Sequence, residues 1–248
     1  MRLGIIFLMV VSAMPAVAQM MPMAYTPDHA AQVADLQCVF APEPFVDSDP
    51  DSSYAWVRWK TVANFTFGKD RGSLPMIADL NALHPYFRDQ VQLLIQRCRD
   101  KGIELAVVET FRTHAKQNEY RGMGKNYTRS KGGRSKHQYG LAVDVVPLKD
   151  SVAIWDNRAL WKKIGLEGER LGLRWGGRWR SLYDPGHFEW TGGLSTQTLA
   201  QGAFPSLPQP RVYPTLTRDL ARLQTYWQAW EAEQGTRASV PDQQTGRK

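Results

Sequence analysis

The sequence predicts an α+β fold in which a small, mainly antiparallel sheet is flanked by helices within one main domain. Three segments have the spacing or capping signals of helices, and two shorter runs have the composition of strands. These segments alternate along the chain with unequal lengths, which is typical of an α+β domain. With 248 residues, 43% of them hydrophobic and 22% charged, the chain is expected to be globular.

The helices are predicted from apolar residues that recur at steps of three and four. The first occupies residues 79–98 and ends before Gly102, since glycine commonly follows the last helical turn. Its periodic residues are Leu80, Leu83, Phe87, Val91, Leu94 and Cys98. Asp156 is expected to cap another helix that ends near Gly172, and Thr113 is expected to cap a short one.

Residues 103–109 and 141–148 are predicted to be strands, because they are rich in β-branched and apolar side chains. Gly140, just before the second strand, permits a tight bend. Alternate residues of a strand share a face, so Ala142 and Asp144 point the same way. The small side chain of Ala142 leaves room for a metal ion beside Asp144.

Composition divides the chain into four parts. Residues 1–18 resemble a secretory signal peptide, and residues 19–77 form an N-terminal extension whose aromatic stretch fits either a strand pair or a flap. Residues 78–192 form the main domain. Residues 193–248 contain a proline-rich connector, an amphipathic helix that is expected to pack on the main domain, and a disordered tail. The periodic residues of that helix are Leu216, Leu220, Leu223, Trp227 and Trp230.

The signal peptide has a basic start, a short apolar core and a small-x-small exit at Ala16-Val-Ala18. It predicts an exported protein, periplasmic or extracellular, without a stable membrane span after cleavage. An uncleaved membrane anchor is the alternative. In an oxidising compartment Cys38 and Cys98 can form one disulfide, although two buried thiols would also fit.

The formal net charge of +7 suits an anionic surface such as a cell wall, and it is explained equally well by solubility. Basic residues alternate with acidic ones and form no nucleic-acid-binding motif. We therefore predict no nucleic-acid partner.

Two segments concentrate the groups that carry chemistry. In the first, His137 and Asp144 lie seven residues apart. In the second, His187 follows a Pro-Gly bend, with Asp184 three residues before it and Glu189 two residues after it. Two imidazoles and one carboxylate around an open position form a ligand set that catalytic zinc uses. Each residue alone is more often structural, but their coincidence favours a metal site.

The chain resembles a known family in three motifs that occur in the same order over about residues 78–190. They are Ser-x-His-x-x-Gly-x-Ala-x-Asp, Trp-Gly-Gly-x-Trp and Asp-x-x-His-Phe-Glu. The family is that of the zinc peptidases that cut peptidoglycan stem peptides. It includes D-alanyl-D-alanine carboxypeptidases, the vancomycin-resistance dipeptidase and L-alanyl-D-glutamate endopeptidases of phage endolysins and bacilli.

The resemblance implies a fold of the hedgehog and D-Ala-D-Ala peptidase kind, with residues 78–192 as the zinc peptidase domain. It also implies Zn²⁺ bound by His137, Asp144 and His187, with Asp184 as the catalytic base. The substrates would be peptidoglycan stem peptides. An aspartate at position 184, together with Trp175-Gly-Gly-Arg-Trp179, is closer to the endolysin branch and favours the L-alanyl-D-glutamate bond. A D-alanyl-D-alanine carboxypeptidase and a non-catalytic wall-binding relative are the alternatives.

Three more residues complete the expected site. Glu189 is either a rival base or a group that orients a metal ligand by a hydrogen bond. The resemblance assigns Arg112 and Ser135 to substrate binding, where a guanidinium can clamp a carboxylate. A surface salt bridge is the alternative role for Arg112.

Overall fold

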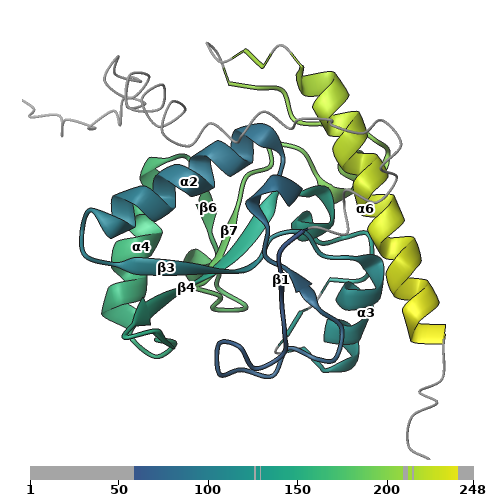
Figure 1. Ribbon diagram of the computed structural model, residues 1–248. Coiled ribbons are helices and arrows are strands. Elements are labelled where there is room, and N and C mark those ends of the chain that lie inside the picture. Colours follow the sequence, from purple (N-terminus) through teal and green to yellow (C-terminus); the bar gives the residue numbers. More distant parts are fainter. Residues whose placement is uncertain (1–58, 126, 129, 209–211, 214, 240–248) are drawn as a thin grey trace, which may run out of the picture. The chain divides into compact units, whose positions relative to one another are not determined.

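The computed structural model describes residues 59–125, 127–128, 130–208, 212–213 and 215–239 (Figure 1). The predicted signal peptide, most of the N-terminal extension and Cys38 lie outside these residues. Within them, antiparallel strands and flanking helices form the predicted α+β fold. The fold class is therefore confirmed.

The main sheet has the strand order β3-β4-β7-β6. The short strand β5 also belongs to this sheet and pairs with the end of β4. Every pairing in it is antiparallel. The strands are β3 (Glu104–Glu109), β4 (Ala142–Lys149), β5 (Val152–Ala153), β6 (Arg174–Trp175) and β7 (His187–Glu189). The two strands expected from composition are thus the two longest strands, β3 at one end of the order and β4 beside it, while the short strands were not predicted.

Strand β4 lies between β3 and β7, and six consecutive residues from Ala142 to Pro147 are buried. Its register places Asp144 opposite His187 on one side and opposite Glu109 on the other. Residues that face each other across antiparallel strands project from the same face of the sheet. Three neighbouring strands therefore bring two carboxylates and an imidazole into one row.

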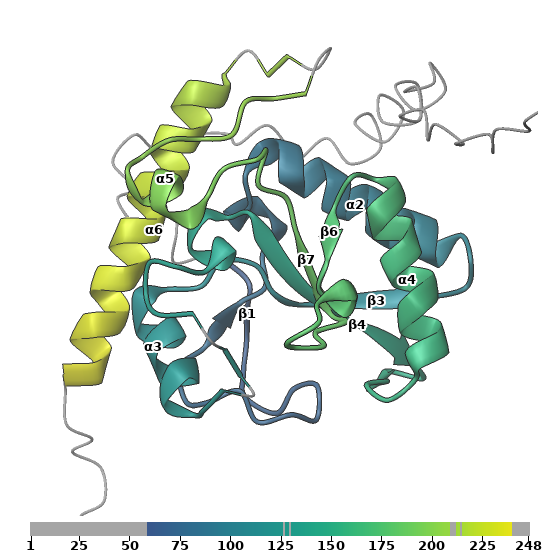
Figure 2. The same cartoon turned by 180° about the vertical axis from the view of Figure 1, so that it is seen from behind.

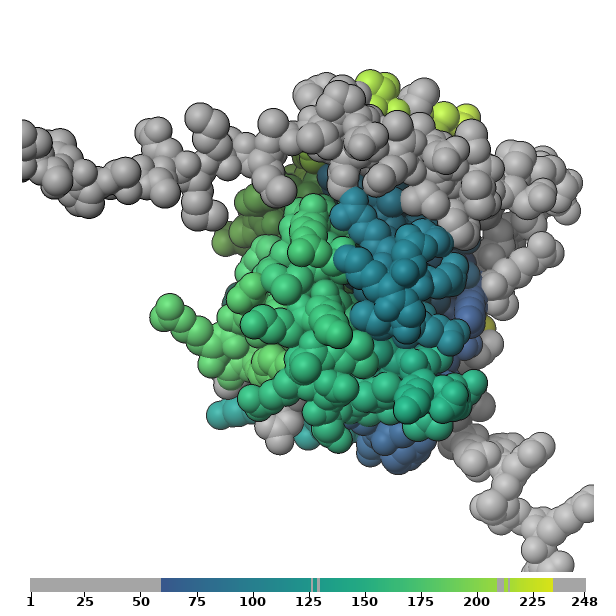
Figure 3. Space-filling view, turned by 90° about the vertical axis from the view of Figure 1, so that its left-hand side faces the viewer, coloured from purple at the N-terminus to yellow at the C-terminus, as the bar shows by residue number. Residues whose placement is uncertain are grey.

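Helices α2 (Pro85–Arg99) and α4 (Arg158–Arg170) contact each other, and they pack beside β3 and β6 respectively. Figure 3 shows their outer surfaces side by side. The predicted first helix begins too early, because residues 80–82 form a separate 3₁₀ turn, η2 (Leu80–Ala82), and Pro85 opens α2. Asn157, not Asp156, caps α4, since its side-chain oxygen accepts a hydrogen bond from the backbone of Leu160.

The remaining helices are α3 (His114–Gly122), α5 (Thr196–Ala200) and α6 (Leu216–Ser239). Thr113 caps α3 as predicted, because its side chain accepts a hydrogen bond from the backbone of Lys116 at 3.0 Å. Helix α6 lies along α3 in both views (Figures 1 and 2). Glu231 of α6 accepts a hydrogen bond from the backbone of His114, at the first residue of α3.

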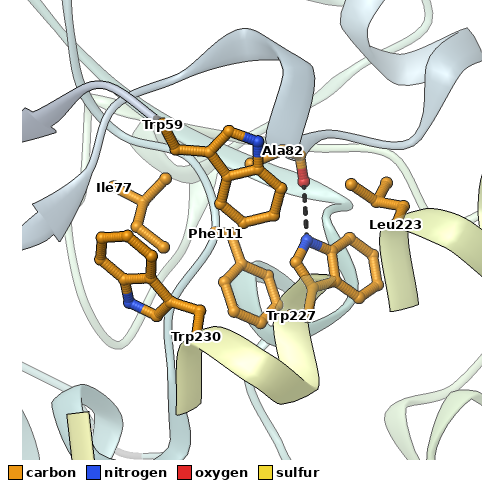
Figure 4. Packing of buried hydrophobic residues seen from close by; sticks show 7 residues of the cluster. All are labelled: Trp59, Ile77, Ala82, Phe111, Leu223, Trp227 and Trp230. Carbon is orange, nitrogen blue, oxygen red and sulfur yellow. Dashed lines mark hydrogen bonds between the residues drawn. The ribbon is translucent and has the colours of Figure 1, made fainter. Parts of the chain in front are cut away.

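Helix α6 contributes to a buried aromatic cluster, as expected from its periodic apolar face (Figure 4). The cluster consists of Trp59, Ile77, Ala82, Phe111, Leu223, Trp227 and Trp230. The ring of Trp227 stacks on Phe111 with centroids 4.8 Å apart, and its Nε1 donates a hydrogen bond to the carbonyl of Ala82 at 3.3 Å. This core therefore joins segments from both ends of the described chain.

A second, two-stranded sheet consists of β1 (Thr61–Val62) and β2 (Met76–Ile77). The sequence left open whether this region forms a strand pair or a flap. The region forms a strand pair, and the loop between the two strands lines the cavity described below, as a flap would.

Cys98 is buried on α2, and burial raises the pKa of its thiol to about 12. A disulfide with Cys38 stays a prediction, since Cys38 lies outside the described residues. Among the helices of the described part of the chain, none has the length and apolar character needed to cross a membrane.

Candidate metal centre

Two imidazole nitrogens and one carboxylate oxygen lie close together where β4 pairs with the first residue of β7. Nδ1 of His187 lies 3.0 Å from Oδ1 of Asp144 and 3.2 Å from Nε2 of His137. The same Asp144 oxygen lies 3.3 Å from Nε2 of His137. All three residues are buried, and each offers one ligand atom to a shared point.

The backbone explains why these side chains meet. Asp144 and His187 are direct cross-strand partners. His137 comes from the 3₁₀ turn η3 (Lys136–Tyr139), which follows Ser135 as cap and ends at Gly140. Gly140 has a φ of 61°, and a Cβ there would lie 2.7 Å from Trp227 and 2.9 Å from the carbonyl of Ala82. Only glycine allows this bend to pack against α6.

Hydrogen bonds on the outer side of each histidine fix which nitrogen faces the centre. Nδ1 of His137 lies 2.8 Å from the carbonyl oxygen of Thr110, which can only accept, so this nitrogen carries the proton. Nε2 of His187 lies 3.3 Å from a carboxylate oxygen of Glu189. Both rings therefore direct a lone pair inward when neutral, which is the arrangement that metal-binding histidines adopt.

The carboxylate of Asp144 is divided between the two sides of the centre. Oδ1 faces the histidines, while Oδ2 lies 3.3 Å from Arg112 and 3.6 Å from Arg71. Burial opposes its charge, but the two histidines hold the pKa of Asp144 well below its usual range. Burial also opposes charge on His187, yet its bonds to Asp144 and Glu189 raise the pKa to about 10. This donor set attracts a cation, and its N₂O composition fits zinc.

Arg112 is buried rather than part of a surface salt bridge. Its Nε donates a hydrogen bond to Glu109 at 3.0 Å, and its Nη1 donates one to Gln117 at 3.1 Å. Glu109 is fully buried, and the sequence analysis missed it. The sequence offers one signal for this residue, because a carboxylate at the end of a buried strand needs a partner and Arg112 follows three residues later.

All residues predicted for the site line one cavity of about 870 Å³. They are Arg112, Ser135, His137, Asp144, Asp184, His187 and Glu189. The cavity also includes Lys69, Arg71, Trp155 and Trp179, of which the sequence analysis named only Trp179, as the end of the Trp-Gly-Gly-x-Trp motif. The Trp179 ring lies 4.9 Å from the ring of His187.

Asp184 lies in the bend before β7, and its backbone is held by the Trp-Gly-Gly motif. Its N–H donates a hydrogen bond to the carbonyl of Gly176 at 3.3 Å. A Cβ on Gly176 would lie 2.4 Å from the carbonyl oxygen of Asp184, so the motif requires glycine for this close approach. Burial, and then the charge of Asp144, raise the pKa of the Asp184 carboxyl. A raised carboxyl pKa suits a group that exchanges protons.

The carboxylate of Glu189 has partners at both oxygens. One oxygen faces His187, and the other forms an ion pair with Arg174. Burial raises the pKa of Glu189, but the contacts with His187 and Arg174 outweigh it and lower the pKa. These contacts support the orienting role over the role of base.

Comparison with known proteins identifies relatives of this chain. Residues 128–190 match the sequence profile of a family described as D-alanyl-D-alanine carboxypeptidase. The chain is 31% identical over 130 residues to the peptidoglycan L-alanyl-D-glutamate endopeptidase CwlK of Bacillus subtilis. That match covers 47% of this chain and 76% of the relative. The chain belongs to this peptidase family.

Membership makes the protein a hydrolytic peptidase. The chain is also 29% identical over 130 residues to the L-alanyl-D-glutamate peptidase of Listeria phage A118, covering 51% of this chain and 45% of the relative. Among solved structures, it is similar to the Serratia marcescens L-Ala D-Glu endopeptidase ChiX. The TM-score is 0.37 at 28% identity, over 45% of this chain and 83% of that chain.

Proposed function

We propose that the protein is an exported zinc peptidase that hydrolyses the L-alanyl-D-glutamate bond of peptidoglycan stem peptides. The convergence of His137, Asp144 and His187 on one point of a cavity carries this proposal. The named activities of the two relatives in Bacillus subtilis and the Listeria phage support the choice of bond. Export rests on the composition of residues 1–18.

The three buried ligand atoms would hold the zinc ion. Bound there, zinc would lower the pKa of a water molecule and polarise the scissile carbonyl. Thr110 and Glu189 keep the two imidazoles in the required tautomers through the contacts described above. Arg112 and Arg71 hold the outer oxygen of Asp144, which leaves the inner oxygen for the metal.

Asp184 would perform the proton transfers. Its carboxylate would accept a proton from the attacking water and return it to the amine that leaves. Burial and the neighbouring charge of Asp144 favour proton uptake by this carboxylate. Ser135 and Arg112 would bind the substrate at the wall of the same cavity. Residues 78–192 would form the catalytic domain, with the flanking segments as supports.

Mass spectrometry of defined muropeptides incubated with the purified protein tests the proposal. A cut after L-alanine is expected, and it should disappear with a chelator and return when zinc is restored. Loss of terminal D-alanine instead would reassign the protein as a carboxypeptidase. A folded, zinc-loaded sample that cleaves no stem peptide would contradict the proposed activity altogether.

A further inference from the structure

We infer that Lys69 and Arg71, on the loop between β1 and β2, form an anion-binding subsite for the free carboxylate of the residue that follows the scissile bond. Both side chains line the cavity that contains the metal centre. They lie before the segment that resembles the peptidase family. The inference rests on the proposed function and identifies what would make the enzyme prefer an acidic residue at that position.

The loop is fixed to α3 at its base. Glu119 of α3 accepts hydrogen bonds from the backbone and the hydroxyl of Ser73, each at 2.6 Å. Lys116 of α3 donates a hydrogen bond to the carbonyl of Leu74 at 2.6 Å and another to the carbonyl of Arg71. Because Lys116 bonds to the backbone carbonyl of Arg71, the backbone from which the Arg71 side chain projects is held in place.

Trp155, on the segment between β5 and α4, fixes the other end of the loop. Its indole Nε1 donates a hydrogen bond to the carbonyl of Phe67 at 2.7 Å. The ammonium of Lys69 lies 3.9 Å from the centre of the same indole ring, within the range of a cation–π contact. The guanidinium carbon of Arg71 lies 5.6 Å from that centre. One tryptophan therefore supports both cations.

Both cations line the cavity of the metal centre, and Arg71 contacts one of the proposed ligands. Arg71 is 3.6 Å from the outer oxygen of Asp144, and its side chain is 19% exposed, so it can also contact a ligand in the cavity. Lys69 forms no ion pair within 4 Å in the described part of the chain. Burial, followed by the charge of Arg71, lowers the pKa of Lys69, although the charges of Asp156 and Asp184 act in the opposite direction. An anion between the two side chains would relieve this repulsion.

The proposed substrate supplies such an anion. A glutamyl residue has two carboxyl groups, and the chain that continues beyond it uses only one of them in an amide bond. The other stays free beside the amine that leaves when the L-alanyl bond is cut. This carboxylate would enter the cavity together with the scissile bond, where Lys69 and Arg71 line the wall.

Paired substrates test this assignment directly. We would compare the L-alanyl-D-glutamyl peptide with the same peptide in which the free carboxylate is an amide. Wild-type protein should favour the carboxylate form by about tenfold or more in kcat/KM, as expected for a lost charge-assisted hydrogen bond. K69Q and R71Q should each reduce this preference, chiefly by raising KM for the carboxylate form. Kinetics of K69Q on the amide form should change little, whereas R71Q should also lose activity on the amide form, because Arg71 contacts Asp144.

Lys163→Gln is the matched control, since it removes one positive charge from an exposed position of α4 outside the cavity. It should retain the full preference. Calorimetric binding of the D-glutamyl product, with and without the amide, gives a readout independent of turnover. Zinc content measured on each variant separates loss of the subsite from loss of metal. K69Q is the cleaner variant, because Arg71 also contacts Asp144.

Three outcomes would overturn the inference. They are equal cleavage of both substrates by the wild type, an equal loss on both substrates in K69Q, and product binding that ignores the amide. The proposed function fails in a different way, namely when the wild type leaves the L-alanyl-D-glutamyl bond intact. In that event the calorimetric comparison still decides whether the subsite binds a carboxylate.

Discussion

The carboxylates around the metal centre differ in the cationic residues with which they pair. Arg112 contacts Asp144, but the buried carboxylate of Glu109 already pairs with the same guanidinium. Arg112 can therefore hold the outer oxygen of Asp144 without cancelling its charge. Glu189 is likewise paired with Arg174 while it contacts His187. Arg71 also lies 3.6 Å from the outer oxygen of Asp144, so both guanidinium groups contact this carboxylate on one side and leave its inner oxygen facing the two histidines, where a cation can bind.

The two carboxylates that flank His187 should respond differently to neutralisation. Asp184→Asn removes the proposed proton acceptor, so kcat should fall by about 10²–10⁴-fold while zinc affinity stays near that of the wild type. Glu189→Gln removes the acceptor that fixes the tautomer of His187. We expect it to weaken zinc binding by about 10–100-fold, with activity largely restored at excess zinc. Steady-state kinetics and competition with a zinc chelator measure both quantities.

The reverse pattern would exchange the two roles. If Glu189→Gln lost activity that zinc could not restore, while Asp184→Asn kept its turnover, Glu189 would be the base. Glu104→Gln, which neutralises an exposed carboxylate of β3 outside the cavity, is the control and should leave both kcat and zinc affinity within about twofold of the wild type.

Spacing identified these residues, but it could not supply their partners. Asp184, His187 and Glu189 stand together in the sequence around a Pro-Gly bend. Their relation to Asp144 depends on the register between strands that are far apart in the chain. Lys69 and Arg71 had no local signal at all, because long-range bonds from Glu119 and Trp155 bring their loop to the cavity.

At the level of elements, α6 supports the segments that precede Arg112 and follow His137. Trp227 stacks on Phe111, the residue before Arg112, and its ring approaches Gly140 at the end of η3. The periodic face of α6 predicted the burial of Leu220, Leu223, Trp227 and Trp230 correctly, while Leu216 is only partly buried. It could not predict the contact surface, because Trp59, Phe111 and Ala82 come from three separate parts of the sequence.

Removal of the Trp227 ring should therefore affect both stability and the site. Trp227→Ala leaves a cavity in the aromatic cluster, and we expect it to lower the free energy of unfolding by about 3–5 kcal/mol. It should also weaken zinc binding, because the bend at Gly140 loses the ring against which it packs. Denaturant unfolding and zinc titration measure the two effects.

Gln228→Ala provides the control on the exposed face of the same helix, where a change within about 0.5 kcal/mol is expected. Equal stability of Trp227→Ala and the wild type would show that α6 does not depend on this contact. A stable variant with unchanged zinc affinity would separate the helix from the metal centre.

Errors in the predicted elements have local causes. Asp156 and Asn157 are both good caps, and the sequence does not show which of them directs its side chain to the helix. The first helix was extended to residue 79 because Leu80 and Leu83 continue the apolar spacing. Pro85 favours a start at its own position, since its ring pre-sets the backbone of the first helical turn.

For the whole molecule, His84 is expected to make the free energy of unfolding depend on pH. The side chain is fully buried before α2, and neither ring nitrogen has a hydrogen-bonding partner in the described part of the chain. Burial, with a further contribution from Arg88, lowers its pKa from 6.5 to about 4. The imidazole is therefore neutral in the folded protein at pH values where the unfolded chain already protonates it.

The sign of the pH dependence follows from this difference. Between pH 6.5 and 4 the unfolded chain binds a proton at His84 that the folded chain does not bind, so acidification favours unfolding. At 1.36 kcal/mol per pKa unit, this one group should lower the free energy of unfolding by about 3 kcal/mol as the pH falls from 7 to 4. Above pH 7 it should contribute no slope.

Comparison with His84→Phe isolates this contribution from the other titrating groups. Denaturant unfolding of both proteins at pH 7, 5.5 and 4 should give curves that diverge on acidification, with the wild type losing about 3 kcal/mol more than the variant. Leu and Gln replacements at the same position guard against a packing defect specific to phenylalanine. Parallel curves for the wild type and all three variants would show that His84 is protonated within the fold, and that the buried ring finds a partner there.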